Sequence, residues 1–67
     1  MFKIGDRVRY LGKNFSIIRC IGTVMATKQD NEYEGYKLRS DEVLVDFGFE
    51  DTNEYVVRTK SLELVRE

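Results

Sequence analysis

The sequence contains no histidine, no proline and no tryptophan, and its only cysteine is Cys20. Histidine is the most common general base and a frequent zinc ligand, so its absence argues against acid–base catalysis and against a structural zinc site. A single cysteine cannot form an intrachain disulfide, and in an apolar stretch it is typical of a small buried residue rather than a nucleophile. We therefore expect a protein that is not an enzyme and that holds no cofactor or metal ion.

Long hydrophobic runs are also missing. The apolar stretches are far shorter than the roughly 20 residues of a membrane-spanning helix, and no basic segment followed by an apolar run marks a secretory signal. These absences predict a cytoplasmic protein without a membrane partner. The 67 residues suffice for a single domain, 1–67, and a domain of this size buries only about 60% of its unfolded surface. A closed sheet or a second subunit must then stabilise it, so a homo-oligomer stays an open alternative.

Large apolar residues recur at every other position in several short segments, which is the spacing that puts one side of a β-strand in the core. The first segment places Val8 and Tyr10 inside and Arg7 and Arg9 outside. Further strands are expected over 17–27, 43–47, 55–58 and 62–65, with a tight helical turn at 59–61. The polar segment 28–41 has no such period and predicts a long loop between the second and third strands.

The second segment is interrupted by Gly22. A glycine inside a strand marks a bulge, a sharp bend or the close approach of another backbone. If the alternation continues through the segment, the residues expected to point inward are Ile18, Cys20, Val24 and Ala26.

The order of these features resembles the small five-stranded Src-homology-3-like (SH3-like) barrels, in particular the KOW-type and Tudor-type modules. Gly5-Asp6-Arg7-Val8, Gly12 and Gly22-Thr23-Val24 are similar to the KOW pattern of a strand valine, a turn glycine and a glycine-x-valine. Residues 43–48 and 62–65 are similar to the closing strands. The resemblance implies an all-β, small five-stranded SH3-like barrel with a long loop between the second and third strands. It also implies a binding module, since such barrels commonly bind RNA, DNA, peptides or the transcription and translation machinery.

The net charge of −1 conceals a division along the chain. Residues 1–28 hold six basic residues against one acidic residue, a net charge of +5. Residues 29–54 hold nine acidic residues against two basic ones, a net charge of −7. This asymmetry marks a binding surface, or else basic and acidic strands neutralise each other across the sheet.

Two partners fit this division. The acidic half and the long loop favour a protein partner, because tyrosine is enriched among interface anchors; the proposed contacts are Tyr33, Tyr36, Glu32 and Glu34. The alternative is RNA or DNA, bound by a basic strand face and by rings that stack on bases if they are exposed; its contacts are Arg7, Arg9, Lys13, Arg19, Tyr10 and Phe15. A continuous basic face would favour nucleic acid, and interleaved charges would favour protein.

We expect a non-catalytic binding module acting mainly through protein–protein interaction. A barrel that begins at Met1 and closes near Val65 further suggests a self-contained gene product, such as a small accessory or regulatory protein.

Overall fold

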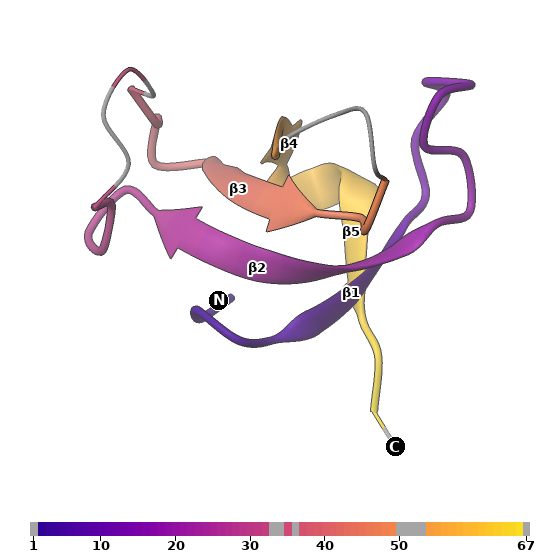
Figure 1. The fold of residues 1–67 in the computed structure, drawn as a ribbon, viewed down its shortest axis with the longest axis horizontal. Coiled ribbons are helices and arrows are strands. Elements are labelled where there is room, and N and C mark those ends of the chain that lie inside the picture. The colour runs from indigo at the N-terminus through magenta and orange to yellow at the C-terminus, as the bar shows by residue number, and fades with distance from the viewer. Residues whose placement is uncertain (1, 33–34, 36, 50–53, 67) are drawn as a thin grey trace.

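The computed structural model describes residues 2–32, 35, 37–49 and 54–66. These residues form one antiparallel sheet of five strands, in the order β4-β3-β2-β1-β5 (Figure 1). A single 3-10 turn, η1, joins β4 to β5. The elements in chain order are β1 (Arg7–Tyr10), β2 (Ile21–Thr27), β3 (Glu42–Asp46), β4 (Tyr55–Arg58), η1 (Thr59–Ser61) and β5 (Leu62–Leu64).

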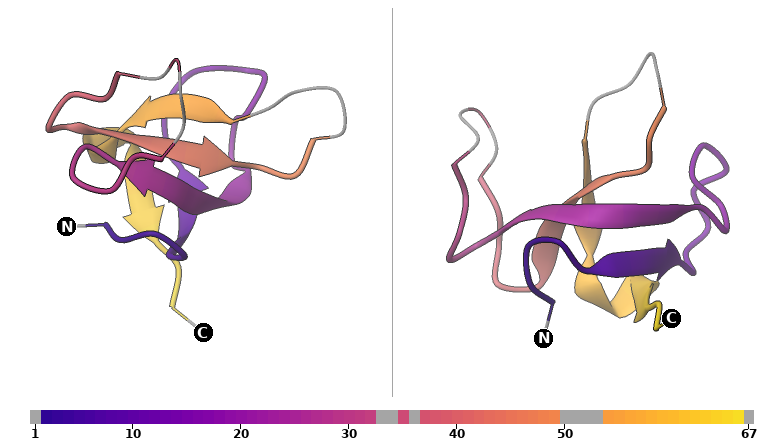
Figure 2. Two further views of the ribbon diagram at one scale, coloured as in Figure 1. Left: turned by 60° about the vertical axis from the view of Figure 1, so that its left-hand side comes forward. Right: turned by 60° about the horizontal axis from the view of Figure 1, so that its bottom comes forward.

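The sheet curves so that its last strand lies beside its first. β1 pairs with β2 on one side and with β5 on the other, with Tyr10 opposite Leu62. β4 and β5 form the two edges and do not pair with each other, so the sheet is open. The β1–β2 connection lies at one end of the sheet and the β2–β3 connection at the other, as Figures 1 and 2 show.

No helix in the described part of the chain is long and apolar enough to cross a membrane.

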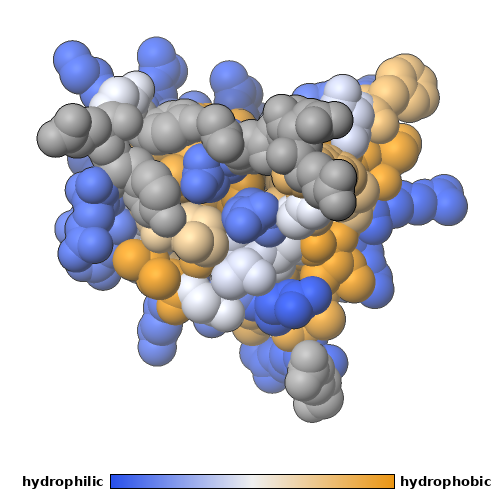
Figure 3. Space-filling model, viewed as in Figure 1, coloured by the Kyte–Doolittle hydropathy of each residue, from blue (hydrophilic) through white to orange (hydrophobic). Residues whose placement is uncertain are grey.

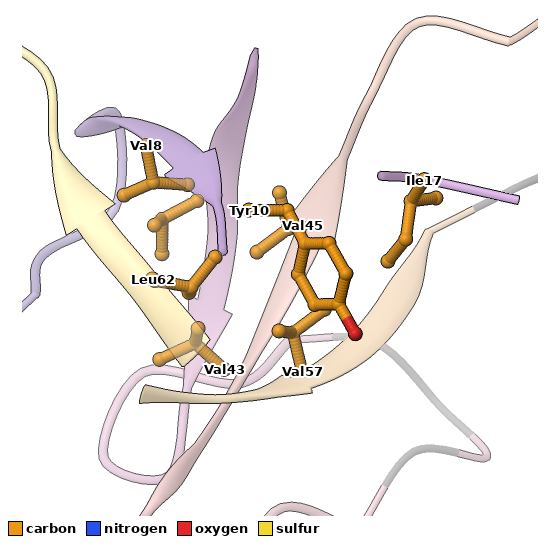
Figure 4. Packing of buried hydrophobic residues seen from close by; sticks show 8 residues of the cluster. Val8, Tyr10, Ile17, Val43, Val45, Val57 and Leu62 are labelled. Atoms are coloured by element: carbon orange, nitrogen blue, oxygen red, sulfur yellow. The ribbon is translucent and has the colours of Figure 1, made fainter. Parts of the chain in front are cut away.

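The core lies on the concave side of the sheet and takes residues from every strand. Figure 4 shows the packed side chains, with Ile17 of the β1–β2 connection pointing toward the ring of Tyr10. The alternation expected for β1 is confirmed, since Val8 and Tyr10 are buried while Arg7 and Arg9 are exposed. The cluster consists of Val8, Tyr10, Ile17, Val24, Val43, Val45, Val57 and Leu62.

The expectation of a continuous strand over 17–27 is wrong at its beginning, because β2 starts only at Ile21. Residues before it form a turn in which the Cys20 N–H donates to the Ile17 carbonyl (3.1 Å). Arg19 adopts a left-handed φ of 60°, which reverses the chain and breaks the alternation. As a result Ile17 is the buried residue (2% exposed) and Ile18 points outward (43% exposed), while Cys20 is only half-buried.

Gly22 marks a close approach of another backbone, as one reading of its position predicted. A Cβ at this position would lie 2.7 Å from the Asp46 carbonyl oxygen and 2.7 Å from the Phe47 ring. The register shift falls elsewhere, between Val24 and Ala26. Val24 and Ala26 are nevertheless both buried, as expected.

Candidate binding surfaces

The β1–β2 connection, residues 11–20, is held against the core by its own hydrogen bonds. The Tyr10 hydroxyl accepts a hydrogen bond from the Asn14 N–H (3.2 Å), and the Asn14 side chain accepts one from the Ser16 N–H (3.0 Å). The Leu11 N–H donates to the Ser61 carbonyl (2.8 Å), which ties the connection to η1. With Ile17 packed in the cluster beneath it, the connection is a structured surface rather than a loose loop.

Large hydrophobic side chains project from this connection into solvent. Phe15 is 88% exposed and Leu11 is 56% exposed. Ile18 and the first residue of β2, Ile21, are also exposed. In Figure 3 hydrophobic colour gathers along the same side of the molecule, over the β1–β2 connection. We call this surface, with Phe49, the apolar end; its residues are Leu11, Phe15, Ile18, Ile21 and Phe49.

Phe49 joins this surface because β3 ends there. Thr23, near the start of β2, pairs with Asp46 at the end of β3, so the residues that follow β3 lie at the same end of the sheet as Ile21. The ring of Phe49 lies 6.5 Å from Phe47 and 6.4 Å from Tyr55, measured between ring centroids. The contact with Tyr55 is edge-on and the contact with Phe47 is tilted; aromatic pairs of this kind hold ring positions, so Phe47 and Tyr55 position the Phe49 ring.

The two outward arginines of β1, Arg7 and Arg9, lie in cross-strand rows that also contain acidic residues. The Arg9 guanidinium lies 3.6 Å from the Glu63 carboxylate on β5, with both side chains about half exposed. Arg7 pairs across the sheet with Thr23, and Thr23 pairs in turn with Asp46. Each arginine therefore has an acidic residue in its own cross-strand row, so charges of both signs are interleaved across these strands.

The residues suggested for nucleic-acid contact occupy different environments. Lys13 and Arg19 are exposed in the β1–β2 connection, within the segment that carries Phe15. Tyr10 is buried, at 8% exposure, with its ring packed 6.4 Å from Phe47 in an edge-on contact. A buried ring leaves no open face on which a base could stack, whereas the Phe15 ring is open.

Of the residues suggested for protein contact, Glu32 lies in the β2–β3 connection, at the opposite end of the sheet from the apolar end. Glu32 is exposed, while Tyr33, Glu34 and Tyr36 fall outside the described residues. A cleft of about 580 Å³ lies at the base of this connection. Its lining includes Phe2, Val43, Lys28 and Lys60.

Among the described residues, no group of three or more cysteine, aspartate or glutamate side chains is arranged to hold a metal ion. No family model matches this sequence, and comparisons with curated proteins and with solved structures also found no match.

Sequence reasoning missed most of the apolar end, naming only Phe15 of its five residues. The available signal was the density of large apolar residues between Leu11 and Ile18, which exceeds what one short connection can bury. Assigning residues 17–20 to a strand hid this excess, because a strand would have placed Ile18 inside.

Proposed function

We propose that this protein is a non-catalytic binding module built on an SH3-like barrel. The pairing of β1 with both β2 and β5 supports the barrel, because a sheet whose last strand returns beside its first is curling toward closure. On this proposal the chain is a small cytoplasmic accessory or regulatory protein that acts by binding another macromolecule.

We further propose that the partner is a protein and that it binds the apolar end. The observation that carries this proposal is the exposure of five large hydrophobic side chains at one end of the sheet, headed by Phe15 at 88%. Small soluble proteins seldom expose contiguous apolar surface unless it binds something. Fully burying one such side chain contributes about 1.5–3 kcal/mol, so a few of them provide enough driving force for a specific complex.

The chemistry of the surface favours protein over nucleic acid. Three of its five side chains are aliphatic, namely Leu11, Ile18 and Ile21, and aliphatic groups give bases no π-face to stack on. Lys13 and Arg19 rim the surface with positive charge. The arrangement fits a partner segment that presents apolar side chains flanked by acidic residues, since complementary charges at the rim steer association.

The double variant Phe15→Ser with Ile18→Ser tests this proposal. Both side chains are exposed, so the fold should tolerate the changes within about 0.5 kcal/mol each. Ile4→Ser is the matched control, because Ile4 is 51% exposed and precedes β1, away from the connection that follows it. In affinity capture from the cells that make the protein, a partner held by the wild type and Ile4→Ser but lost by the double variant supports the proposal. A partner that the double variant retains in full contradicts it.

Single-stranded nucleic acid is the second candidate, favoured by the open Phe15 ring beside exposed Lys13 and Arg19. Titration of single-stranded RNA, single-stranded DNA and duplex DNA at several salt concentrations tests it. Binding that weakens steeply with salt and disappears in Lys13→Glu with Arg19→Glu would support a phosphate-binding surface beside Phe15. Absence of binding at low salt would remove this candidate.

A further inference from the structure

The edge strand β4 presents unpaired backbone groups. The Thr59 N–H donates to the Asp41 carbonyl (2.7 Å), and this bond fixes which antiparallel pairs exchange hydrogen bonds. Such pairs alternate along a ladder, so Val57 with Val43 and Tyr55 with Val45 are the bonded pairs. The N–H and C=O of Val56 and the N–H of Arg58 therefore point away from β3.

No described strand pairs with this edge, and the nearest part of the chain across from it is the β1–β2 connection. A cleft of about 220 Å³ runs along all four residues of β4 and is bounded on its other side by Asn14 and Ile17. The Val56 side chain is 44% exposed. A strand edge with unpaired N–H and C=O groups is a template for another β-strand.

The side chains on this edge are complementary to themselves. Alternation places Glu54, Val56 and Arg58 on one side of the strand, as an acid, an apolar residue and a base. Among the described residues the ion pair found is that of Arg9 with Glu63, so neither Glu54 nor Arg58 is paired with a described residue of its own chain. A second copy of this edge, running antiparallel, therefore places its base opposite the acid of the first copy and its acid opposite the base.

We propose that β4 pairs with β4 of a second copy of this chain, forming a symmetric dimer with one sheet continuous across both copies. A two-fold axis beside Val56 sets each Val56 opposite the other, where they exchange N–H and C=O hydrogen bonds. The same axis sets each Glu54 opposite Arg58 of the other copy. Isologous pairing uses each contact twice, and opposite charges facing each other across strands stabilise the pairing. A register centred on Arg58 would instead oppose two guanidinium groups.

A four-residue edge is a small interface, so the dimer should be weak and concentration-dependent. Sedimentation equilibrium of the full chain, up to about 1 mM to reach weak complexes, should show a monomer–dimer equilibrium. Glu54→Arg and Arg58→Glu each replace two attractive pairs with two repulsive ones. Each variant alone should dimerise about tenfold more weakly, or not at all.

Two experiments that restore opposite charges distinguish a loss of this pairing from a general loss of stability. The double variant Glu54→Arg with Arg58→Glu recovers opposite charges and should dimerise like the wild type. An equimolar mixture of the two single variants places arginines on one copy against glutamates on the other, and should form a heterodimer. Because the carboxylate introduced by Arg58→Glu would also face Glu42 within its own chain, the mixture further shows that this variant is folded.

Arg58→Pro tests the backbone contribution, with Arg58→Ala as its control. Arg58 has φ of −72°, which proline adopts readily, and its N–H is not used in the β3 pairing. Both variants lose the side chain, but only the proline variant loses the outward N–H. Arg58→Pro should therefore dimerise more weakly than Arg58→Ala. A monomeric wild type, a double variant that is not restored, or equal dimerisation of Arg58→Pro and Arg58→Ala would each overturn the proposal.

Discussion

Replacing Ile17 with alanine tests how the β1–β2 connection is seated in the core. Ile17 lies outside every strand but is 2% exposed and belongs to the central cluster. Truncating a buried isoleucine to alanine costs about 2–5 kcal/mol, the transfer of the lost methyl groups plus the cavity they leave. At roughly 0.05–0.15 kcal/mol per residue, a chain of this length has a free energy of unfolding of roughly 3–10 kcal/mol. Ile17→Ala should therefore remove a large part of the stability.

The neighbouring residue provides the control. Ile18 is 43% exposed, so Ile18→Ala should change the free energy of unfolding by no more than about 0.5 kcal/mol. Urea denaturation followed by far-ultraviolet circular dichroism measures both variants without relying on tryptophan, which the chain lacks. Similar losses for the two variants, or a larger loss for Ile18→Ala, would refute the reasoning. A larger loss for Ile18→Ala would mean that residues 17–20 continue the alternation of β2, with Ile18 on the same buried side as Val24.

Two further changes test other parts of the account. Gly22→Ala would push a methyl group against the Asp46 carbonyl and the Phe47 ring. Overpacking of this kind destabilises a fold by about 1–3 kcal/mol, so the thermal midpoint of unfolding should fall. A midpoint equal to that of the wild type would contradict the close approach. If the β2–β3 connection contacts a protein partner, Tyr33→Ala with Tyr36→Ala should lose that partner in affinity capture, because interface tyrosines often carry much of the binding energy. If the variant keeps the partner in full, binding is confined to the apolar end.

The strand positions could be predicted wherever apolar alternation is uninterrupted. β4 over 55–58 and the turn at 59–61 match the structure, because Tyr55, Val56 and Val57 are strong strand formers and the polar residues after Arg58 cannot continue the buried side. β3 begins one residue earlier than the apolar pattern, at Glu42. The outward direction of Arg7 and Arg9 follows from the same rule, since strand side chains alternate by residue.

The beginning of the second segment could not be predicted in this way. Isoleucine and cysteine at 17–20 have the composition of a strand, and only a left-handed Arg19 separates them from one. That conformation costs about 1–2 kcal/mol for a residue other than glycine, and burial of Ile17 against the core offsets it. Because the compensation comes from a tertiary contact, no local pattern reveals it. The packing of Ile17 in the core also decides which neighbouring apolar side chains face solvent. Most residues of the apolar end could therefore not be predicted from the sequence.

The role of Tyr10 shows a second limit. From the sequence its ring suited either the core or a stacked base, and the choice depends on Phe47, thirty-seven positions further along the chain. The two rings meet edge-on, a contact that only the pairing of β1 and β3 with the same strand, β2, makes possible.

Photo-crosslinking from the apolar end tests the proposed function most directly. A photoreactive phenylalanine analogue placed at Phe15 would sit on the most exposed side chain of that surface, and the same analogue at Ile4 reports on an exposed position before β1. In the cells that make the protein, we expect a discrete protein adduct from position 15 and none of that size from position 4. An adduct formed equally from both positions, or from position 4 alone, would contradict binding at the apolar end.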